Sequence, residues 1–463
     1  MITLLAAALV TNAAVPIPRP DQAAFRALYK ELVETNTTVS AGSCTLAAER
    51  LAARLRSAGY PDKDLTLFSV PAAPKDGGLV AVLPGRDAKA KAILLLAHLD
   101  VVEARRADWT RDPFVLIEEG GYFNGRGTSD DKAQAAIWTD SLIRWKTAGY
   151  RPKRTIKLAL TCGEETTGVF NGAQYLAEQR RDLIDAGVAL NEGGGGRLDA
   201  AGKPVALAMQ VGEKVYQDFK VEVTNPGGHS SQPVPENAIY RLSAALGRVA
   251  GYTFPVQFND TTRAYFTQVA AIKPGPEATA TTALLKNPAD AAAAAIVSRD
   301  KQNNSLLRTT CVATRVDAGH ANNALPQRAT AIVNCRIFPG MPAARVQAAL
   351  EAAIGDAQVK VTPDVPPVEK DMSVALDPRI FAPARALAAE MFPGVPMLAF
   401  MDTGASDAVW TIPAGIPTYG VPGIFDDPDG GNIHGLNERI RVKSLYDGRD
   451  YLYRLVQLYA DAP

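Results

Sequence analysis

The chain has 463 residues, which at roughly 150 residues per domain allows about three structural units. Its 49 basic and 49 acidic residues give a formal net charge of zero, so it has no basic field that would hold a nucleic-acid backbone. Hydrophobic residues at 47% and charged residues at 21% exclude the disordered and fibrous classes. Histidine is scarce, and the four histidines are His98, His229, His320 and His434.

The first twenty residues resemble a secretory signal. A short apolar run is followed by small residues and prolines, although the positively charged start of such signals is missing. We therefore interpret 1–20 as a signal peptide and linker and expect a periplasmic or secreted protein, with a cytoplasmic protein as the alternative. No stretch reaches the roughly 18 apolar residues of a membrane-spanning helix, so no membrane span is expected.

Two helices and a set of buried strands are predicted for the first part of the chain. Apolar residues recur at helical spacing over 21–34 and in a second segment that ends at Gly59. Continuous apolar runs at 92–97, 156–160 and 187–190 are typical of parallel strands that are buried on both faces. Helical patterns alternate with these strands, which indicates a layered α/β domain.

The pattern of apolar and polar residues along the chain changes after about residue 212. Apolar and polar residues alternate over 219–223 and 331–337, as in antiparallel strands with one wet face, and 343–354 reads as an amphipathic helix closed by Gly355. These features predict a smaller α+β unit. A long apolar helix from about 378 then returns to the first pattern.

The simplest organisation is a catalytic domain in two segments, 21–212 and 366–463, interrupted by a lid at 213–365. Within this lid, Cys311 and Cys335 each lie twelve positions from Asn323, so an antiparallel hairpin centred there would bring them face to face. A disulfide would form in an oxidising compartment, but two buried thiols are the favoured interpretation. The four cysteines contain no CxxC pair, which disfavours a cysteine-built zinc site.

Polar residues follow directly after the buried strands. The residues in these positions are His98, Asp100, Glu164, Glu165 and Glu192, while the buried run 416–421 leads into the loop that ends at His434 and Asp130 precedes a predicted helix. Because ligands of open α/β sheets bind beyond the carboxyl ends of the strands, these side chains should share one rim. Imidazole and carboxylate suit zinc and its neighbours, and such a set can hold two ions about 3.5–4 Å apart.

The chain resembles the co-catalytic zinc exopeptidases, the family of aminoacylase, carboxypeptidase G, carnosinase-like dipeptidases and succinyl-diaminopimelate desuccinylase. The motifs that carry the resemblance are, in chain order, His98-Leu99-Asp100-Val101-Val102, Gly125-Arg126-Gly127-Thr128-Ser129-Asp130-Asp131-Lys132, Gly163-Glu164-Glu165, Leu190-Asn191-Glu192-Gly193-Gly194, Gly227-Gly228-His229-Ser230-Ser231, Asn323-Ala324-Leu325-Pro326 and His434-Gly435. The resemblance implies an α/β/α catalytic domain with a mixed, mostly parallel sheet, interrupted by a smaller α+β lid and dimerisation domain.

The resemblance also implies two metal ions. His98, Asp130 and Glu192 would hold one ion, and Asp130, Glu165 and His434 would hold the other, so that Asp130 bridges the pair. Zinc is the expected metal, with cobalt or manganese as alternatives. A homodimer formed through the lid is the expected assembly.

Two further residues next to the ligands receive roles from the family. Asp100 would accept the second ring N–H of His98 and fix its tautomer. Glu164 would be the general base, taking a proton from the water that bridges the ions and passing it to the leaving amine. The family also implies a cis peptide bond between Asp130 and Asp131.

Four residues are expected to meet the substrate. His229 would reach the active site of the partner subunit and bind the scissile carbonyl or its oxyanion. Asn323 and Arg336 match residues that meet the substrate's carbonyl and carboxylate, and Gly404 matches a backbone contact to the same carboxylate. An ion pair on the surface of the lid is the alternative for Arg336.

These features predict a metal-dependent hydrolase that cleaves an amide bond next to a free carboxylate in a small peptide, as a dipeptidase or carboxypeptidase. An aminoacylase or deacylase acting on N-acyl amino acids is the alternative, because pocket shape decides between them. A metal-free peptide-binding protein with the same fold is a third alternative, although no ligand and no general base is missing from the sequence.

Overall fold

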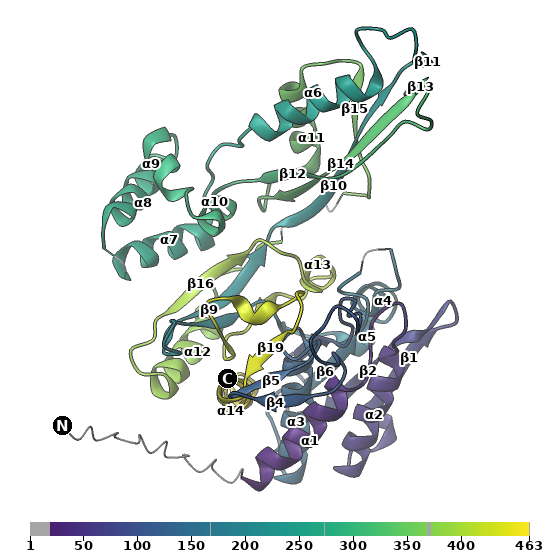
Figure 1. Ribbon diagram of the computed structural model, residues 1–463. Helices are drawn as coiled ribbons and strands as arrows, with labels where there is room; N and C mark the ends of the chain where they lie inside the picture. Colours follow the sequence, from purple (N-terminus) through teal and green to yellow (C-terminus); the bar gives the residue numbers. More distant parts are fainter. Residues whose placement is uncertain (1–18, 167, 273, 368–371, 463) are drawn as a thin grey trace, which may run out of the picture.

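The computed structural model describes residues 19–166, 168–272, 274–367 and 372–462. The predicted signal peptide therefore lies almost wholly outside the described residues. The chain forms a larger part built on a ten-stranded sheet and a smaller part built on a four-stranded sheet (Figure 1). In the segments that are described, no helix combines the length and the apolar character needed to cross a membrane.

The larger sheet is mixed and mostly parallel, as predicted. Its strands follow one another in the order β1 (Leu65–Val70), β2 (Ala73–Leu83), β6 (Ile156–Thr161), β3 (Ile93–His98), β7 (Val188–Asn191), β17 (Thr418–Gly420), β9 (Pro204–Glu213), β8 (Gly195–Leu198) and β18 (Phe425–Asp426), and β16 (Met397–Asp402) pairs with β9. The central strand β3 runs parallel to both β6 and β7, and all of its residues are buried. The apolar run at 92–97 is continuous because helices cover both faces of this strand.

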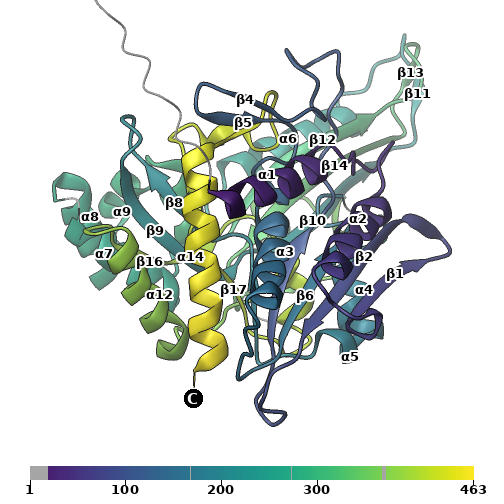
Figure 2. The ribbon, with the colours of Figure 1, turned by 90° about the horizontal axis from the view of Figure 1, so that it is seen from below.

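Helices pack on both faces of the larger sheet and complete an α/β/α sandwich. One face contacts α1 (Pro20–Val33), α2 (Cys44–Ser57), α3 (Lys132–Thr147), α12 (Pro378–Met391) and α14 (Val442–Asp461). The other face contacts α4 (Gly172–Gln179), α5 (Arg181–Ile184) and α13 (Ala408–Thr411). Figure 2 shows α1, α3 and α14 together on the first face. The helix predicted from 378 is α12, so the last segment of the chain returns to the larger part.

A small three-stranded sheet lies at the edge of the larger part. Its strands are β4 (Ile117–Glu119), β5 (Tyr122–Asn124) and β19 (Arg439–Arg441), and two short 3-10 helices, η1 (Asp62–Asp64) and η2 (Gly430–Asn432), lie elsewhere in this part. The pairing of β5 with β19 brings residues 122–124 against residues 439–441. The loop that follows β5 and the loop that precedes β19 are therefore neighbours, although about 300 residues separate them.

The smaller part contains the predicted antiparallel strands. Its sheet is β12 (Thr310–Ala318), β14 (Arg328–Ile337), β10 (Val215–Thr224) and β15 (Val359–Pro363), packed against α6 (Ala238–Gly251) and α11 (Ala343–Ile354). Buried and half-exposed residues alternate along β10, as its sequence predicted. Helix α11 has the predicted bounds, because Gly355 takes the left-handed conformation that ends it. This sheet lies within the predicted lid, 213–365.

Two features of the smaller part extend beyond its sheet. A narrow arm ends in the pair β11 (Gly228–His229) and β13 (Ala324–Leu325). A helical segment comprises α7 (Asp260–Ile272), α8 (Pro276–Lys286), α9 (Ala291–Val297) and α10 (Lys301–Leu307). The segment shares an apolar cluster with Phe400 and Met401 of β16, so it packs against the larger part of the chain.

All four cysteines form disulfides. Cys311 and Cys335 are bonded and face each other in the register of β12 and β14, so the favoured interpretation of two buried thiols is wrong. The sequence had placed these residues correctly but could not show that they are oxidised. Cys44 is bonded to Cys162 across 118 positions, joining the start of α2 to the end of β6. Nothing in the spacing of these two cysteines indicated that they meet.

Both disulfides should be detectable by thiol titration. Their loss should lower the free energy of unfolding by different amounts. Unfolded, unreduced protein is expected to show no free thiols, and reduced protein four. In a chain-entropy treatment the 118-residue separation of Cys44 and Cys162 makes their loss cost about 5 kcal/mol, against about 3.5 kcal/mol for the 24-residue separation of Cys311 and Cys335. Thiol titration and denaturant unfolding of the two double-serine variants test this. Equal stability of both variants would contradict the ranking.

Candidate metal centre

Three parallel strands deliver polar side chains to one edge of the larger sheet. His98 ends β3, Glu164 and Glu165 follow β6, and Glu192 follows β7. Because β3 lies between β6 and β7, the carboxyl ends of these strands are adjacent. The Nε2 atom of His98 lies 3.1 Å from Oδ1 of Asp130 and 3.6 Å from Oε2 of Glu192. The predicted rim of imidazole and carboxylate is therefore formed.

Asp130 lies between two histidines. Its Oδ1 atom is 3.1 Å from Nε2 of His98, and its Oδ2 atom is 3.0 Å from Nε2 of His434. The same His434 nitrogen is 2.9 Å from Oε2 of Glu165. One carboxylate thus turns each of its oxygens towards a different imidazole, which is the placement that a bridging ligand requires. The peptide bond between Asp130 and Asp131 is cis, as the resemblance implied.

The donor atoms are close enough to share metal ions. His98, Glu164 and Glu192 each offer an atom within 4.8 Å of the others, and so do His98, Asp130 and Glu165. These two groups differ from the two predicted ligand sets. Glu164, which is not a predicted ligand, lies in the first group, and His98 lies in both. The predicted ligands nevertheless lie together, and this donor chemistry suits first-row divalent ions.

The charges of the centre suit a divalent cation. Burial, together with repulsion from Glu192, raises the pKa of Glu164 well above its usual range, and burial raises the pKa of Glu192 to about 7. Hydrogen bonds to Asp130 and Glu165 raise the pKa of His434 to about 10. The carboxylates of the centre thus crowd their negative charges together beside the imidazoles. A divalent cation would remove this repulsion, so the residues fit a metal site.

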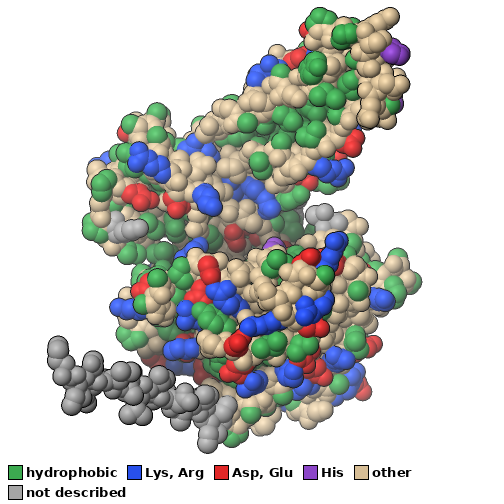
Figure 3. Space-filling view, in the orientation of Figure 1, with side chains coloured by type: hydrophobic (Ala, Val, Ile, Leu, Met, Phe, Trp, Pro, Cys, Tyr) green, Lys and Arg blue, Asp and Glu red, His purple; other side chains and the backbone are tan. Residues whose placement is uncertain are grey.

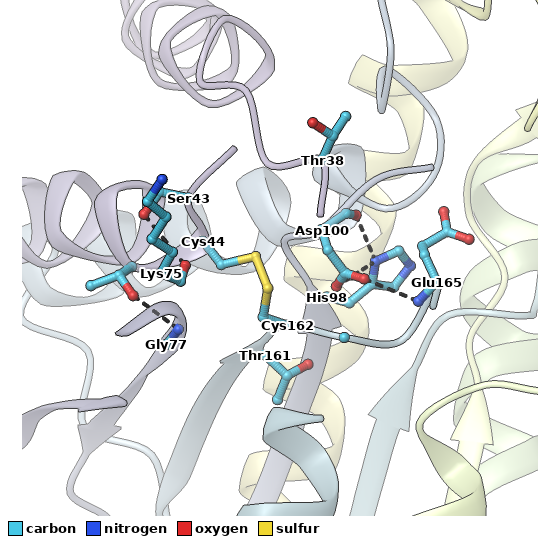
Figure 4. The surroundings of a disulfide bond; sticks show 12 residues. Thr38, Ser43, Cys44, Lys75, Gly77, His98, Asp100, Thr161, Cys162 and Glu165 are labelled. Carbon is cyan, nitrogen blue, oxygen red and sulfur yellow. Dashed lines mark hydrogen bonds and ion pairs between the residues drawn. A yellow bond between two sulfur atoms is a disulfide. The ribbon is translucent and has the colours of Figure 1, made fainter. Parts of the chain in front are cut away.

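Asp100 lies beside His98 and Glu165. The Nδ1 atom of His98 lies 3.0 Å from the backbone oxygen of Asp100 and 3.6 Å from its carboxylate oxygen Oδ1. The carboxylate accepts a 3.0 Å hydrogen bond from the backbone N–H of Glu165 (Figure 4). The carboxylate lies beside the ring at 3.6 Å, and the expectation that it accepts the ring N–H stays a prediction. Asp100 orients His98 through its main chain and holds the Glu165 backbone through its side chain.

A disulfide borders the loop of Glu164 and Glu165. Cys162 immediately precedes Gly163-Glu164-Glu165, and its bond to Cys44 anchors the end of β6 to α2 (Figure 4). Asn171 supports the same loop by donating a 2.9 Å hydrogen bond to the Gly163 carbonyl. The position of Glu164 is thus fixed by covalent and hydrogen-bonded contacts.

Glu438 is a buried residue of this centre that the sequence did not identify. Its Oε2 atom accepts hydrogen bonds from Arg126 Nη1 at 2.7 Å and from the Gly127 N–H at 2.9 Å. Its Oε1 atom accepts the N–H groups of Ser129 at 2.8 Å and Asp130 at 3.2 Å. One carboxylate therefore accepts backbone N–H groups of the loop that carries Asp130. No family motif named above includes Glu438, and the only sequence signal is a glutamate four positions after His434.

Asp407 is a second buried carboxylate that no sequence argument singled out for a role. It accepts hydrogen bonds from the Thr161 hydroxyl at 2.8 Å and from Asn171 Nδ2 at 3.1 Å. Asn171 also donates to the Gly163 carbonyl, so Asp407 supports the loop of Glu164 through Asn171. Its nearness to Gly404 in the sequence was the available signal.

The structure places His229 and Asn323 away from the metal centre. His229 is exposed on β11, at the far end of the arm in Figure 1, and its Nδ1 atom accepts the hydroxyl of Ser231 at 2.7 Å. The Asn323 carbonyl accepts the Ser230 N–H at 3.1 Å, so these two predicted residues share one tip. Within a single chain they do not join the ligands.

Arg336 and Gly404 lie nearer the junction of the two parts. Arg336 extends from β14 over the ring of Tyr216, with 4.8 Å between its guanidinium and the ring centre, and the described residues offer it no acidic partner. The alternative of a surface ion pair is therefore not seen in the described structure. The Gly404 N–H donates a 2.9 Å hydrogen bond to the Asp402 carboxylate.

An α/β/α sheet that presents two histidines and a shared carboxylate at its strand ends, beneath a smaller lid, defines a co-catalytic metallohydrolase. The comparison with known proteins agrees: the chain belongs to Peptidase family M20/M25/M40, whose model matches residues 94–458. It is accordingly a metallohydrolase of the peptidase type, and the predicted family is confirmed.

Several curated relatives are similar over most of the chain. The N-fatty-acyl-amino acid synthase/hydrolase PM20D1 of Homo sapiens is 29% identical over 388 residues, covering 81% of this chain and 75% of the relative. A probable carboxypeptidase S-like 2 of Dictyostelium discoideum is 27% identical over 386 residues, covering 81% and 72%. These relatives include both peptidase and acyl-amino acid hydrolase names.

Solved structures support the fold. The M20 family metallo-carboxypeptidase Sso-CP2 of Sulfolobus solfataricus aligns with a TM-score of 0.69 at 16% identity, covering 96% of this chain and all of that one (100%). Human carnosine dipeptidase 1 aligns with a TM-score of 0.63 at 17% identity, covering 95% and 97%. At such identities the likeness concerns the fold alone, and it includes the arrangement of a sheet domain and a lid.

Proposed function

We propose that this chain hydrolyses an amide bond next to a free carboxylate in a small peptide, as a dipeptidase or carboxypeptidase with two divalent metal ions. The observation that carries the proposal is the position of Asp130, whose two oxygens lie 3.1 Å and 3.0 Å from the histidines His98 and His434. Such a shared carboxylate suits two ions about 3.5–4 Å apart. The family membership supports the reaction class.

The ligand sets are those that the family resemblance implies, and their members lie at the rim. His98, Asp130 and Glu192 would hold one ion, and Asp130, Glu165 and His434 the other. Zinc fits these nitrogen and oxygen donors best, with cobalt and manganese as substitutes. Bound metal would lower the pKa of a water molecule and polarise the scissile carbonyl.

Glu164 is the general base of this proposal. Its carboxylate lies among the ligand atoms, beside His98 and Glu192, without being needed for either ligand set. Metal binding would neutralise the carboxylates whose repulsion now raises the pKa of Glu164. Glu164 would then accept a proton from the attacking water and donate it to the nitrogen of the leaving amine, which departs as a neutral amine.

The lid residues complete the substrate site. Arg336 would bind the free carboxylate through its guanidinium fork, and the backbone near Gly404 would lie beside it. His229 and Asn323, at the tip of the arm, would reach the centre of a partner subunit in a homodimer, where His229 would stabilise the oxyanion. A strictly monomeric enzyme whose activity survives His229→Ala would contradict this assignment.

Hydrolysis of N-acyl amino acids is the second candidate. It involves the same amide bond and the same free carboxylate, and the similarity to N-fatty-acyl-amino acid hydrolases favours it. The two candidates differ in what lies on the acyl side of the scissile bond, an amino acid or a fatty chain. The same catalytic residues serve both reactions.

A substrate panel with metal analysis tests the proposal. Purified protein should bind about two equivalents of zinc, as expected of a dinuclear site. Removal of metal with a chelator should abolish hydrolysis of dipeptides and N-acyl amino acids, and zinc, cobalt or manganese should restore it. Faster turnover of dipeptides supports the first candidate, and faster turnover of N-acyl amino acids the second. Protein that binds no metal and cleaves neither class would support a non-catalytic binding protein instead.

An oxidising compartment suits this chain. The two disulfides favour a periplasmic or secreted location, because cytosolic thiols are normally kept reduced. The signal-like start of the sequence points the same way. Free thiols in protein isolated from its native source would count against this location.

A further inference from the structure

Three cationic side chains converge where the larger part, the lid sheet and the helical segment meet. Lys214 directly follows β9, Arg308 follows α10, and Arg336 lies on β14. Thr310, the first residue of β12, faces Arg336 in the strand register and also accepts a hydrogen bond from Lys214 Nζ at 3.1 Å. The cluster of Lys214, Arg308 and Arg336, here termed the cationic cluster, therefore draws on all three structural units.

The cationic cluster has no acidic partner in the described residues. Lys214 is only 1% exposed, yet its Nζ atom donates only to two hydroxyls, those of Ser305 at 3.3 Å and Thr310 at 3.1 Å. Arg308 donates to the Ser298 hydroxyl at 3.1 Å, while its Nε atom and the Nη1 atom of Arg336 are buried without a hydrogen-bond partner. No aspartate or glutamate in the described ranges forms an ion pair with any of the three cations.

Burying unpaired charge is costly, so the cluster calls for an anion. Burial, and after it the charges of Arg336 and Arg308, lower the pKa of Lys214 to about 7. The neutral hydroxyls around Lys214 cannot offset this repulsion. Bound carboxylates would supply negative charge to these side chains.

A chain of contacts connects the backbone of Lys214 and its neighbour Glu213 with Asn191, the residue before Glu192. The Lys214 N–H donates to the Asp402 carbonyl at 3.0 Å, and its neighbour Glu213 accepts the Ser406 hydroxyl at 2.8 Å. Ser406 in turn accepts a 3.2 Å hydrogen bond from Asn191, the residue before Glu192. Figure 3 shows Lys and Arg side chains on the lower face of the lid, across a hollow from acidic side chains and a histidine. An anion in the cluster would thus belong to a substrate that reaches the metal centre.

We propose that Lys214 and Arg308 bind a second carboxylate of the substrate, the acidic side chain of its C-terminal residue, while Arg336 binds the α-carboxylate. This inference rests on the proposed function, in which Arg336 already meets one carboxylate. A single carboxylate would neutralise one of the three cations, of which Lys214 and Arg308 are buried and Arg336 is half-buried, whereas a C-terminal glutamate or aspartate carries two negative charges. The preferred substrates are therefore peptides or N-acyl amino acids that end in an acidic residue.

The pair Ala-Glu and Ala-Gln tests the proposal, because the two dipeptides have the same shape and differ in one charge. We expect the enzyme to favour Ala-Glu by about 10- to 100-fold in kcat/KM, mainly through KM, as one charge-assisted contact allows. Lys214→Met should reduce this preference to about threefold or less. Lys220→Met is the matched control, since Lys220 lies half-buried on β10 beside Glu222, and it should leave the preference unchanged.

Further variants separate binding from a structural role. Lys214→Arg should keep most of the preference, and Arg308→Met should weaken it as Lys214→Met does. In the ligand-free protein Lys214→Met should not lower Tm, because it removes an unpaired buried charge. The KM for Ala-Glu should also rise above about pH 7 as Lys214 loses its proton, with no such rise in Lys214→Met. A marked fall in Tm, with the preference intact in a refolded sample, would overturn the proposal.

Binding without turnover distinguishes this inference from the proposed function. Metal-loaded Glu164→Gln protein should bind Ala-Glu about tenfold or more tightly than Ala-Gln by calorimetry. Equal affinities would overturn the proposal even if both dipeptides are hydrolysed. Tighter binding of Ala-Glu by a protein that cleaves neither peptides nor N-acyl amino acids would instead leave the acidic-residue site standing and reject the proposed function.

Discussion

Replacement of Glu164 by glutamine is expected to lower kcat by about 100- to 10,000-fold, because the amide cannot accept a proton from water or return one to the leaving nitrogen. The substitution keeps the size of the side chain. It also removes one negative charge from a crowded set, in which Glu192 already raises the pKa of Glu164. The free energy of unfolding should therefore not fall. Steady-state kinetics and metal analysis of the zinc-loaded variant measure both effects.

Glu165→Gln is the matched control, because it makes the same chemical change one residue further along. The Glu165 carboxylate lies 2.9 Å from His434, so this variant should lose affinity for one of the two ions as well as activity. Titration with zinc would show the difference. If Glu164→Gln lost metal and Glu165→Gln retained it, the two roles would have to be exchanged. Near-normal kcat in Glu164→Gln would reject the general-base assignment altogether.

The rim was predictable because local sequence determines it. A continuous apolar run such as that of β3 can only be a buried strand or a buried helix, and its six residues are too short for a helix. Once three such strands are parallel, the residues that follow each of them must meet at one edge. His98, Glu165 and Glu192 could therefore be placed together from the sequence, without knowledge of any contact between them.

The remaining features depend on contacts that local sequence does not encode. Cys44 and Cys162 meet only because α2 packs beside the end of β6, and nothing in the sequence near either cysteine reports that packing. The Asp100 carboxylate accepts the Glu165 N–H, and the Asp100 backbone oxygen lies at the His98 ring nitrogen. The sequence near Asp100 does not show which of its oxygens meets which nitrogen. Lys214 escaped notice because a lysine is normally exposed, and only the fold shows that it is buried.

The family motifs include the expected metal ligands but not the residues that position these ligands. Asp130 sits on a loop rich in glycine, in which the backbone N–H groups of Gly127, Ser129 and Asp130 donate to an acceptor outside the loop. Their acceptor, Glu438, arrives from about 300 residues later through the pairing of β5 with β19. A single buried carboxylate thus holds the backbone of Asp130 in place. Its removal should therefore affect both folding and metal binding.

Glu438→Ala is expected to lower the free energy of unfolding by about 3–5 kcal/mol, because it leaves the buried Arg126 without its counter-charge. Glu438 is fully buried (0% exposed) and lies 2.7 Å from Arg126. The variant also leaves the N–H groups of Gly127, Ser129 and Asp130 unsatisfied, so the loop should shift and zinc affinity should fall. Denaturant unfolding and zinc titration of the folded variant measure the two losses.

Glu118→Ala provides the comparison for this effect, since it also removes a glutamate from an ion pair with an arginine. Glu118 pairs with Arg26 at 2.5 Å, but both side chains are partly exposed, at 32% and 45%. Its loss should cost about 1 kcal/mol or less and leave zinc binding unchanged. If Glu438→Ala behaved like Glu118→Ala, the loop would have to keep Asp130 in place through its own backbone. The difference between the two variants therefore measures how far a buried carboxylate distant in sequence determines the metal centre.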